Sequence, residues 1–164
     1  MHRHVLVSPS RMKWVTKTKV KGCLFCRIYR DDPEIPKRVL YRSKDVFVIM
    51  NIFPYNTGHL QVLPVRHVES LESLTDEEIT SLFTMVKKCI KLLKRTLKPK
   101  GFNIGINQGL EISGASIKHL HVHIVPRFRR DFGFMEITGG TKVLPESVDQ
   151  TFEKLIKYVK MLEV

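Results

Sequence analysis

Residues 118–127 read KHLHVHIVPR, and this short stretch holds three of the seven histidines of the 164-residue chain. Residues two apart on a β-strand point to the same face, so the sequence predicts a strand with histidines on one face and apolar side chains on the other. The outer two would lie roughly 13 Å apart at ~3.3 Å per residue, too far for all three to act on one atom. The central histidine is therefore expected to do the chemistry and its neighbours to have other tasks. The three are His119, His121 and His123.

A histidine can act as a base or as a nucleophile that forms a covalent intermediate. A nucleophilic nitrogen needs a free lone pair, so the other ring nitrogen must keep its proton by donating to a fixed acceptor such as a backbone carbonyl. The preceding residues 107–116 are polar and small at both ends, and Gly114, Ala115 and Ser116 lead directly into the strand. Small residues let backbone N–H groups approach an anion, and Ser116 adds a hydroxyl. Alone, this segment is compatible with an ordinary hairpin loop; beside the histidines it indicates a phosphate cradle, and hence phosphoryl or nucleotidyl transfer.

The length of the chain suits one domain with its own core, and the sequence divides into a basic N-terminal arm, residues 1–20, and a single domain, residues 21–164. No apolar run approaches the length of a membrane span and the N-terminus lacks the pattern of a secretory signal, so a cytoplasmic protein is expected. Twenty-eight Lys and Arg against sixteen Asp and Glu give a net charge of +12. This excess is compatible with a solvated basic surface and equally with attraction of a polyanion.

Short apolar segments separated by turn residues predict five strands. They cover residues 39–41, 46–50, 59–63, 102–107 and 119–125. A long helix is expected between the third and fourth strands, because residues 75–78 form a capping box and apolar residues, Cys89 among them, then follow helical spacing to Leu97. A second helix is expected over residues 148–162. The fold class is therefore α+β with a mostly antiparallel sheet.

The order of residues 119–125 is histidine, apolar, histidine, apolar, histidine, apolar, apolar. In this pattern, and in the placing of Asn51, His59 and residues 114–116, the chain resembles the histidine triad (HIT) superfamily of nucleotide hydrolases and transferases. The match runs from Cys23 to about Arg127. The resemblance implies a HIT-like antiparallel five-stranded sheet with one long helix and a C-terminal helix, whose sheets join across a homodimer.

Residues 11–14, 134–135 and 141–146 are similar to the prokaryotic branch of the superfamily that includes diadenosine tetraphosphate hydrolases and phosphorylases. Residues 129–133 depart from the Gly-Asp-x-Asn-Phe form of that branch, which bears on substrate detail and not on the chemistry. The resemblance implies an enzyme that cleaves dinucleoside polyphosphates at the α-phosphate through a nucleotidyl-histidine, with water or phosphate as the acceptor. Two alternatives stay open: a nucleoside phosphoramidate hydrolase, and a non-catalytic nucleotide- or RNA-binding module that uses the basic arm and the lysine-rich helix.

The resemblance also implies roles for individual residues. His121 would be the nucleophile, and His123 and His59 would contact the phosphates and help the leaving group. Ser116 and the backbone at Gly114 would hold the α-phosphate. The other implied binding residues are Asn51 for the ribose, Ile52 and Phe53 beside the base, Asn107 and Gln108 along the phosphate path, and Ala115, which stands where some members carry a glutamine phosphate ligand.

Cys23 and Cys26 form a CxxC, which alone is half of a Cys₂His₂ zinc site. A disulfide switch and a pair of small core residues are the alternatives. In zinc-bearing members of the superfamily the other ligands are the histidine after the Pro-containing turn and the first triad histidine, here His67 and His119. The resemblance therefore implies a structural Zn²⁺, removed from the reacting phosphate.

Overall fold

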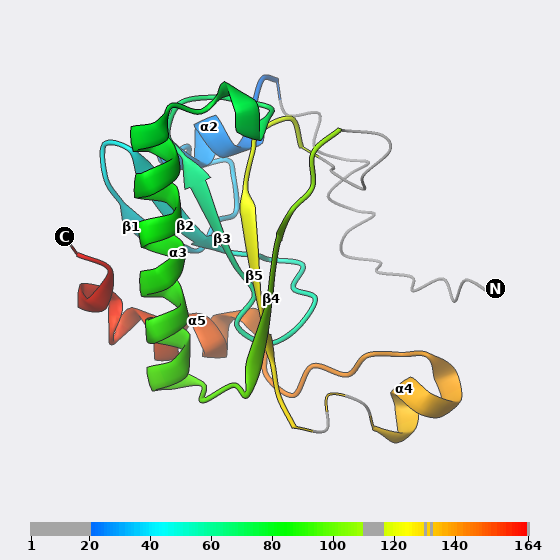
Figure 1. The fold of residues 1–164 in the computed structure, drawn as a ribbon. Helices are drawn as coiled ribbons and strands as arrows, with labels where there is room; N and C mark the ends of the chain where they lie inside the picture. The colour runs from blue at the N-terminus through cyan, green and yellow to red at the C-terminus, as the bar shows by residue number, and fades with distance from the viewer. Residues whose placement is uncertain (1–20, 110–116, 130, 132, 164) are drawn as a thin grey trace.

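The centre of the protein is a five-stranded antiparallel sheet with the order β1-β2-β3-β5-β4 (Figure 1). The computed structural model describes residues 21–109, 117–129, 131 and 133–163, so the expected basic arm lies outside the described residues. The strands are β1 (Val39–Arg42), β2 (Val46–Met50), β3 (Leu60–Pro64), β4 (Gly101–Ile106) and β5 (Val122–Arg127). The helices are α2 (Leu24–Tyr29), η1 (Leu71–Ser73), α3 (Asp76–Thr96), α4 (Phe134–Gly139), α5 (Val148–Ile156) and η2 (Val159–Leu162). The predicted class, with five strands, one long helix and a C-terminal helix, is confirmed.

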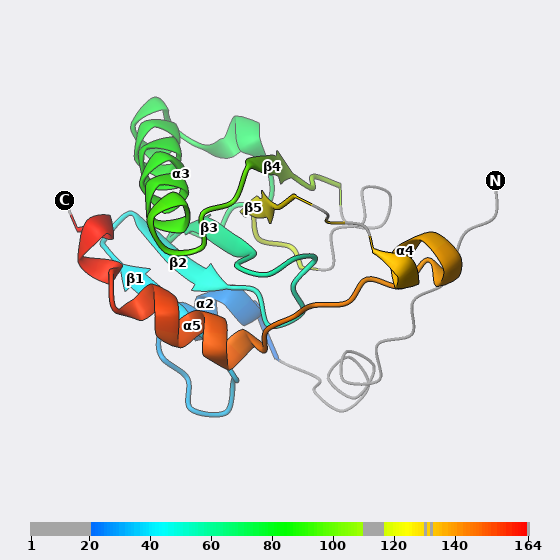
Figure 2. The ribbon, with the colours of Figure 1, turned by 90° about the horizontal axis from the view of Figure 1, so that it is seen from below.

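The sheet separates two hydrophobic cores, because alternate residues of a strand point to opposite faces. All five residues of β2 are buried. Val46, Val48 and Met50 join the larger core, under α3, while Phe47 and Ile49 join the smaller core, under α2. Figure 2 shows the sheet between these two helices. The smaller core thereby fixes α2, which carries the CxxC, against the sheet.

Helix α3 begins at the predicted capping box. The side chain of Thr75 accepts a hydrogen bond from the backbone N–H of Glu78, and the Glu78 carboxylate accepts one from the N–H of Thr75. These two bonds satisfy backbone donors that have no partner inside the helix. The first turn is acidic and the last turn is basic, which suits the helix dipole. No helix among the described residues has the length and apolarity needed to cross a membrane.

The structure differs from the sequence-based expectation in the fifth strand, in the C-terminal helix and in short helices that were not expected. The fifth strand begins at Val122 and not at residue 119, because the N–H of Leu120 donates to the carbonyl of Val68, 2.7 Å away, instead of to a neighbouring strand. The expected helix over 148–162 is split into α5 and η2. There the N–H of Tyr158 bonds to the carbonyl of Leu155, three residues back, which tightens the turn after α5. Helices α2 and α4 were not expected from the sequence.

Candidate functional site

His121 lies just before β5 and is buried. Its Nδ1 lies 2.8 Å from the carbonyl oxygen of His119, an acceptor only, so Nδ1 carries the proton and donates it. Nε2 of His121 is then left with a free lone pair. Burial lowers the pKa of His121, which favours the neutral ring. The side chain thus meets the two conditions for a nucleophilic imidazole: neutrality and a fixed tautomer.

His59 and His123 meet because of the register of β3 and β5. His59 immediately precedes β3, where Gln61 lies opposite His123, so His59 and His123 are diagonal neighbours on one face of the sheet. Nε2 of His59 lies 2.9 Å from Nδ1 of His123. The ring of His123 in turn lies 4.6 Å from that of His121, centroid to centroid. The structure therefore brings three of the predicted catalytic residues together.

The direction of these hydrogen bonds follows from one backbone donor. The N–H of Tyr55 donates to Nδ1 of His59 over 3.2 Å, so the proton of His59 resides on Nε2 and is donated to Nδ1 of His123. His123 must then carry its own proton on Nε2, which is buried and has no hydrogen-bond partner among the described residues. Burial, the largest cause, lowers the pKa of His59 to about 3 and that of His123 to about 4, so both rings are neutral near pH 7. The chain of bonds ends in an N–H group free to donate beside His121.

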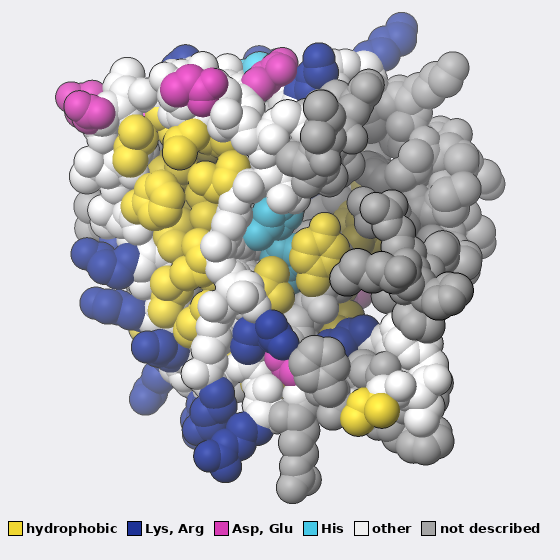
Figure 3. Space-filling model, turned by 45° about the vertical axis from the view of Figure 1, so that its right-hand side comes forward, with side chains coloured by type: hydrophobic (Ala, Val, Ile, Leu, Met, Phe, Trp, Pro, Cys, Tyr) yellow, Lys and Arg dark blue, Asp and Glu magenta, His cyan; other side chains and the backbone are white. Residues whose placement is uncertain are grey.

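The loop between β2 and β3 holds His59 in place. Asn51 contributes twice, since its Oδ1 accepts from the N–H of Phe53 at 2.9 Å and its Nδ2 lies 3.3 Å from Nδ1 of His59. Both ends of the amide, expected to meet a ribose, thus have protein partners. Ile52 and Phe53 follow in the same loop and are partly exposed. Figure 3 shows histidine side chains at the molecular surface, between two groups of hydrophobic side chains.

The predicted phosphate-binding residues are only partly described. Gly114, Ala115 and Ser116 lie outside the described residues. Asn107 and Gln108 follow directly after β4. Gln108 is exposed, and its amide is held by η1, accepting from the N–H of Leu71 at 2.7 Å and donating to Glu72 at 3.0 Å.

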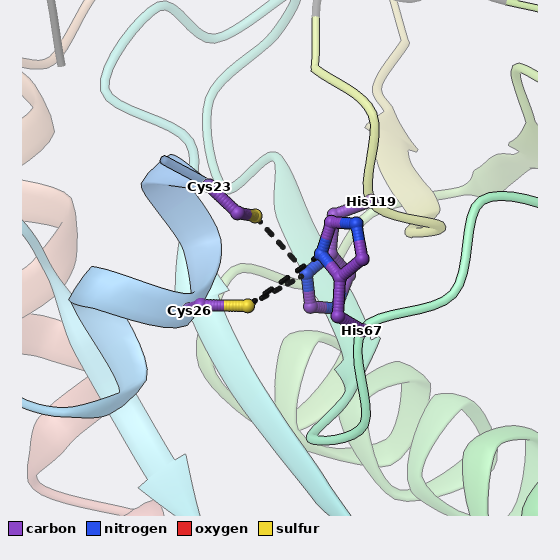
Figure 4. A group of neighbouring side chains, drawn as sticks. All are labelled: Cys23, Cys26, His67 and His119. Carbon is purple, nitrogen blue, oxygen red and sulfur yellow. Dashed lines mark hydrogen bonds between the residues drawn. The ribbon is translucent and has the colours of Figure 1, made fainter. Parts of the chain in front are cut away.

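Four predicted metal ligands form a second cluster beside the histidines. The ligand atoms of Cys23, Cys26, His67 and His119 all lie within 4.8 Å of one another (Figure 4). Cys23 is the residue just before α2 and Cys26 lies within it, His67 follows β3 and His119 precedes β5. Three segments far apart in the sequence therefore meet at this point.

The distances in this cluster fit a tetrahedral zinc ion. Bonds of about 2.3 Å to sulfur and about 2.0 Å to nitrogen place sulfur and nitrogen ligands of one tetrahedral zinc about 3.5 Å apart. Nδ1 of His119 lies 3.3 Å from Sγ of Cys23 and 3.6 Å from Sγ of Cys26, and Nδ1 of His67 lies 3.6 Å from Sγ of Cys26. Nε2 of His119 donates to the carbonyl of Pro64 over 2.9 Å, which leaves the lone pair of Nδ1 facing the sulfurs. The residues present therefore fit a Cys₂His₂ metal site.

Protonation in the cluster is also consistent with a metal site. Burial raises the pKa of the Cys26 thiol to about 11 and lowers that of His119 to about 4. His119 is thus ready to bind a cation, whereas a metal must displace the Cys26 proton to bind a thiolate.

Sequence reasoning did not single out Phe25 or Tyr55. Phe25 lies between the two cysteines in the sequence, and its ring is 5.8 Å from that of His119 and 5.0 Å from that of His121, so it contacts both a predicted metal ligand and the candidate nucleophile. Tyr55 stacks on His59 at 4.9 Å with an interplanar angle of 27°. No periodic pattern identifies either residue, because α2 is only six residues long and Tyr55 lies in a turn.

Comparison with known proteins gives concordant results. A model of the HIT domain family matches residues 32–130, more than half of the chain. The chain is 37% identical over 154 residues to an AP-4-A phosphorylase of Mycobacterium tuberculosis, covering 89% of this chain and 79% of the relative. It is 36% identical over 106 residues to a bis(5'-nucleosyl)-tetraphosphatase [asymmetrical] of Schizosaccharomyces pombe, covering 65% of this chain and 58% of the relative.

Among solved structures, a zinc-bound histidine triad family protein from Mycobacterium smegmatis superposes with a TM-score of 0.70. The two sequences are 24% identical, and the match covers 87% of this chain and 96% of the other, so this likeness concerns the fold. The family match, the similarity to the mycobacterial relative and the fold agree: the chain belongs to the HIT domain family.

Proposed function

We propose that this protein cleaves dinucleoside polyphosphates at the α-phosphate, with His121 as the nucleophile. The observation that carries the proposal is the donor–acceptor pair at His121, whose Nδ1–H is held by the His119 carbonyl at 2.8 Å while Nε2 keeps its lone pair. A purely binding site has no need of a tautomer fixed in this way. The activities named for the mycobacterial and yeast relatives support the same substrate class.

In the first step, the Nε2 lone pair of His121 attacks the α-phosphorus and a P–N bond forms. The bond from phosphorus to the bridging oxygen breaks, and its electron pair leaves with that oxygen. The N–H of His123, donated from Nε2, stabilises the developing charge on the phosphate oxygens, and His59 holds His123 in the required tautomer through the 2.9 Å bond.

In the second step, an oxygen of water or of inorganic phosphate attacks the same phosphorus. The P–N bond breaks and its electron pair returns to Nε2 of His121. Water gives a nucleoside monophosphate and a released proton, whereas phosphate gives a nucleoside diphosphate. We propose that the residues implied by the resemblance bind the substrate. These are Asn51, Ile52, Phe53, Asn107, Gln108, Gly114, Ala115 and Ser116.

We also propose a structural zinc ion on Cys23, Cys26, His67 and His119. When bound, the ion would supply a rigid cross-link between α2, the turn after β3 and the segment before β5. His119 offers its carbonyl to His121 from this cross-linked segment, so the metal site would stabilise the position of the nucleophile. Metal analysis of the purified protein tests this; about one zinc per chain is expected, and no zinc with reduced cysteines would refute it.

A homodimer joined through β4 is part of the proposal. β4 is an edge strand, and Ile104 in the middle of it is 45% exposed. Phe83 of α3 is 44% exposed, and Figure 3 shows hydrophobic side chains gathered over α3 and β4. Such a surface, next to a strand edge that pairs with no other strand among the described residues, suits a second copy of the chain. Sedimentation of wild type and Ile104→Lys tests it, since a dimer is expected to dissociate in the variant.

The function itself is tested by product identification. Diadenosine tetraphosphate is expected to give AMP and ATP with water as the acceptor, or ADP and ATP with inorganic phosphate. His121→Asn is expected to abolish turnover and to leave nucleotide binding largely intact, whereas His4→Asn, a matched change outside the triad, keeps full activity. Turnover that survives His121→Asn would refute the mechanism. Rapid cleavage of an adenosine phosphoramidate without turnover of diadenosine tetraphosphate would refute the substrate class.

A further inference from the structure

Tyr55 is an exposed aromatic side chain at the edge of the histidine cluster. One face of its ring stacks on His59, with the centroids 4.9 Å apart, and 55% of the residue is nevertheless exposed. Its backbone N–H is bonded to Nδ1 of the same histidine, so both ends of the residue are fixed to His59. A large aromatic surface is thus held open to solvent in a defined position.

The ring positions place Tyr55 on one particular side of the site. The centroid of Tyr55 lies 6.1 Å from that of His123, and His123 lies 4.6 Å from His121. The ring contacts of the described residues include no pair between Tyr55 and His121. Tyr55 is therefore in ring contact with His123 and His59 but not with the candidate nucleophile, so a leaving group bound at His123 lies near Tyr55.

The reaction determines what extends in that direction. In the proposed function, on which this inference rests, the bond that breaks joins the attacked phosphorus to the leaving polyphosphate. The N–H of His123, which has no hydrogen-bond partner among the described residues, would be the donor to this leaving group. In a dinucleoside polyphosphate the leaving group ends in a second nucleoside. We propose that the exposed face of Tyr55 is a stacking platform for the base of this leaving nucleotide. Ile52 and Phe53 of the same loop are the residues expected beside the retained base.

An aromatic ring suits this ligand. Every nucleobase has a π-face, so stacking on tyrosine gives affinity with little base selectivity. The ring is held in place before the substrate arrives, which lowers the entropic cost of binding. The platform would favour substrates that carry a second nucleoside over substrates that end in a bare polyphosphate.

The alternative role of Tyr55 is to cover His59, which is fully buried. A covering role affects every substrate equally, whereas a platform affects only those whose leaving group carries a base. The two roles are separated by comparing diadenosine tetraphosphate with adenosine 5'-tetraphosphate. These substrates share the retained adenosine and the number of phosphates, and their leaving groups differ in one nucleoside.

The test measures kcat/KM of wild type, Tyr55→Ala, Tyr55→Leu and Tyr55→Phe on both substrates. Stacking of one base corresponds to about 5- to 150-fold in affinity. We expect Tyr55→Leu, which keeps apolar cover over His59, to lose about that factor on diadenosine tetraphosphate and to change little on adenosine 5'-tetraphosphate. Tyr55→Phe retains the ring and should keep both activities, and Tyr158→Ala, which removes another partly exposed tyrosine, should leave both unchanged.

Any other result of these kcat/KM measurements would refute the proposal that Tyr55 is a stacking platform. An equal loss on both substrates assigns Tyr55 to the support of His59, and no loss in Tyr55→Leu or Tyr55→Ala removes any role in binding. Inhibition by ATP and by tripolyphosphate gives a second readout, since only inhibition by ATP should weaken in Tyr55→Leu. If wild type turns over neither substrate, the proposed function itself fails and the platform fails with it. A working wild type with an unchanged substrate ratio in the variants refutes the platform alone.

Discussion

Gly58 precedes His59 in the loop between β2 and β3, and its replacement by alanine should destabilise the protein strongly. Its φ is +80°, a region in which an L-residue costs roughly 1–2 kcal/mol. A Cβ at this position would overlap Cδ1 of Leu97 and lie 3.2 Å from Cδ2 of Leu93. Overpacking of this kind typically costs about 1–3 kcal/mol. We therefore expect Gly58→Ala to lower the free energy of unfolding by about 2–5 kcal/mol.

Gly22 offers a matched control, because its φ is also +80° and a Cβ there would meet no atom of the described residues within 4 Å. Gly22→Ala should therefore cost only the backbone part, roughly 1–2 kcal/mol. Urea unfolding of wild type and both variants measures the difference, which is the steric part. The double variant Gly58→Ala/Leu97→Ala removes the nearest obstacle and should recover part of the loss. Equal losses in the two single variants would show that the contact with Leu97 and Leu93 costs nothing, and would refute the reasoning.

The same substitution should reduce activity by displacing His59. Gly58 packs against the C-terminal end of α3 and directly precedes His59, which makes the 2.9 Å bond to His123. A shift of a few tenths of an ångström lengthens this bond and weakens control of the His123 tautomer. At a temperature where Gly58→Ala is folded, kcat should fall, while Gly22→Ala retains the wild-type value.

Three further predictions concern stability. The pKa values of His59 and His123, about 3 and about 4, lie below the value of about 6.5 for an unfolded histidine, so their contribution is complete above pH 6.5 and is lost as the pH falls toward 4. The urea midpoint should drop between pH 7 and pH 4.5, and a constant midpoint would contradict the buried neutral rings. Thr75→Ala removes the cap of α3 and should cost about 1 kcal/mol by thermal unfolding, whereas Thr84→Ala, at an exposed position inside the helix, should change little. Asn56→Ala deletes a buried hydrogen bond to Pro126 and a part-buried one to Asp131 and should cost about 1–3 kcal/mol. Asn103→Ala, which deletes an exposed hydrogen bond from Arg127, should cost less than about 1 kcal/mol; equal costs would argue against a structural role for Asn56.

Much of the fold could be predicted because its signals are local. Residues 46–50 were expected as a strand and form β2, and the capping box at residues 75–78 marks the beginning of α3. The beginning of β5 could not be predicted, because it depends on a hydrogen bond from Leu120 to Val68, more than 50 residues away in the sequence. Helix α2 has too few residues for a periodic signal, and it is held by contacts of Phe25 and Ile28 in the smaller core.

The candidate site likewise contains residues that the sequence identified and a residue that only the structure revealed. Sequence and resemblance selected the histidines and the four metal ligands, and the structure brings His59 to His123 and the ligand atoms within 4.8 Å of one another. The place of Tyr55 could not be predicted, since its stacking on His59 depends on how the turn at residues 51–58 folds back.

The sequence by itself determined which side chains are available: alternation places imidazoles at every second residue, and the chain also carries the CxxC and two further histidines, His59 and His67. Only the tertiary structure decided which nitrogen of each ring carries the proton. The carbonyl of Pro64 fixes His119, the carbonyl of His119 fixes His121, and the N–H of Tyr55 sets His59 and through it His123. An imidazole has two nearly equivalent tautomers, so the donor or acceptor that the fold places beside it decides whether it binds a metal, attacks a phosphorus or donates a hydrogen bond.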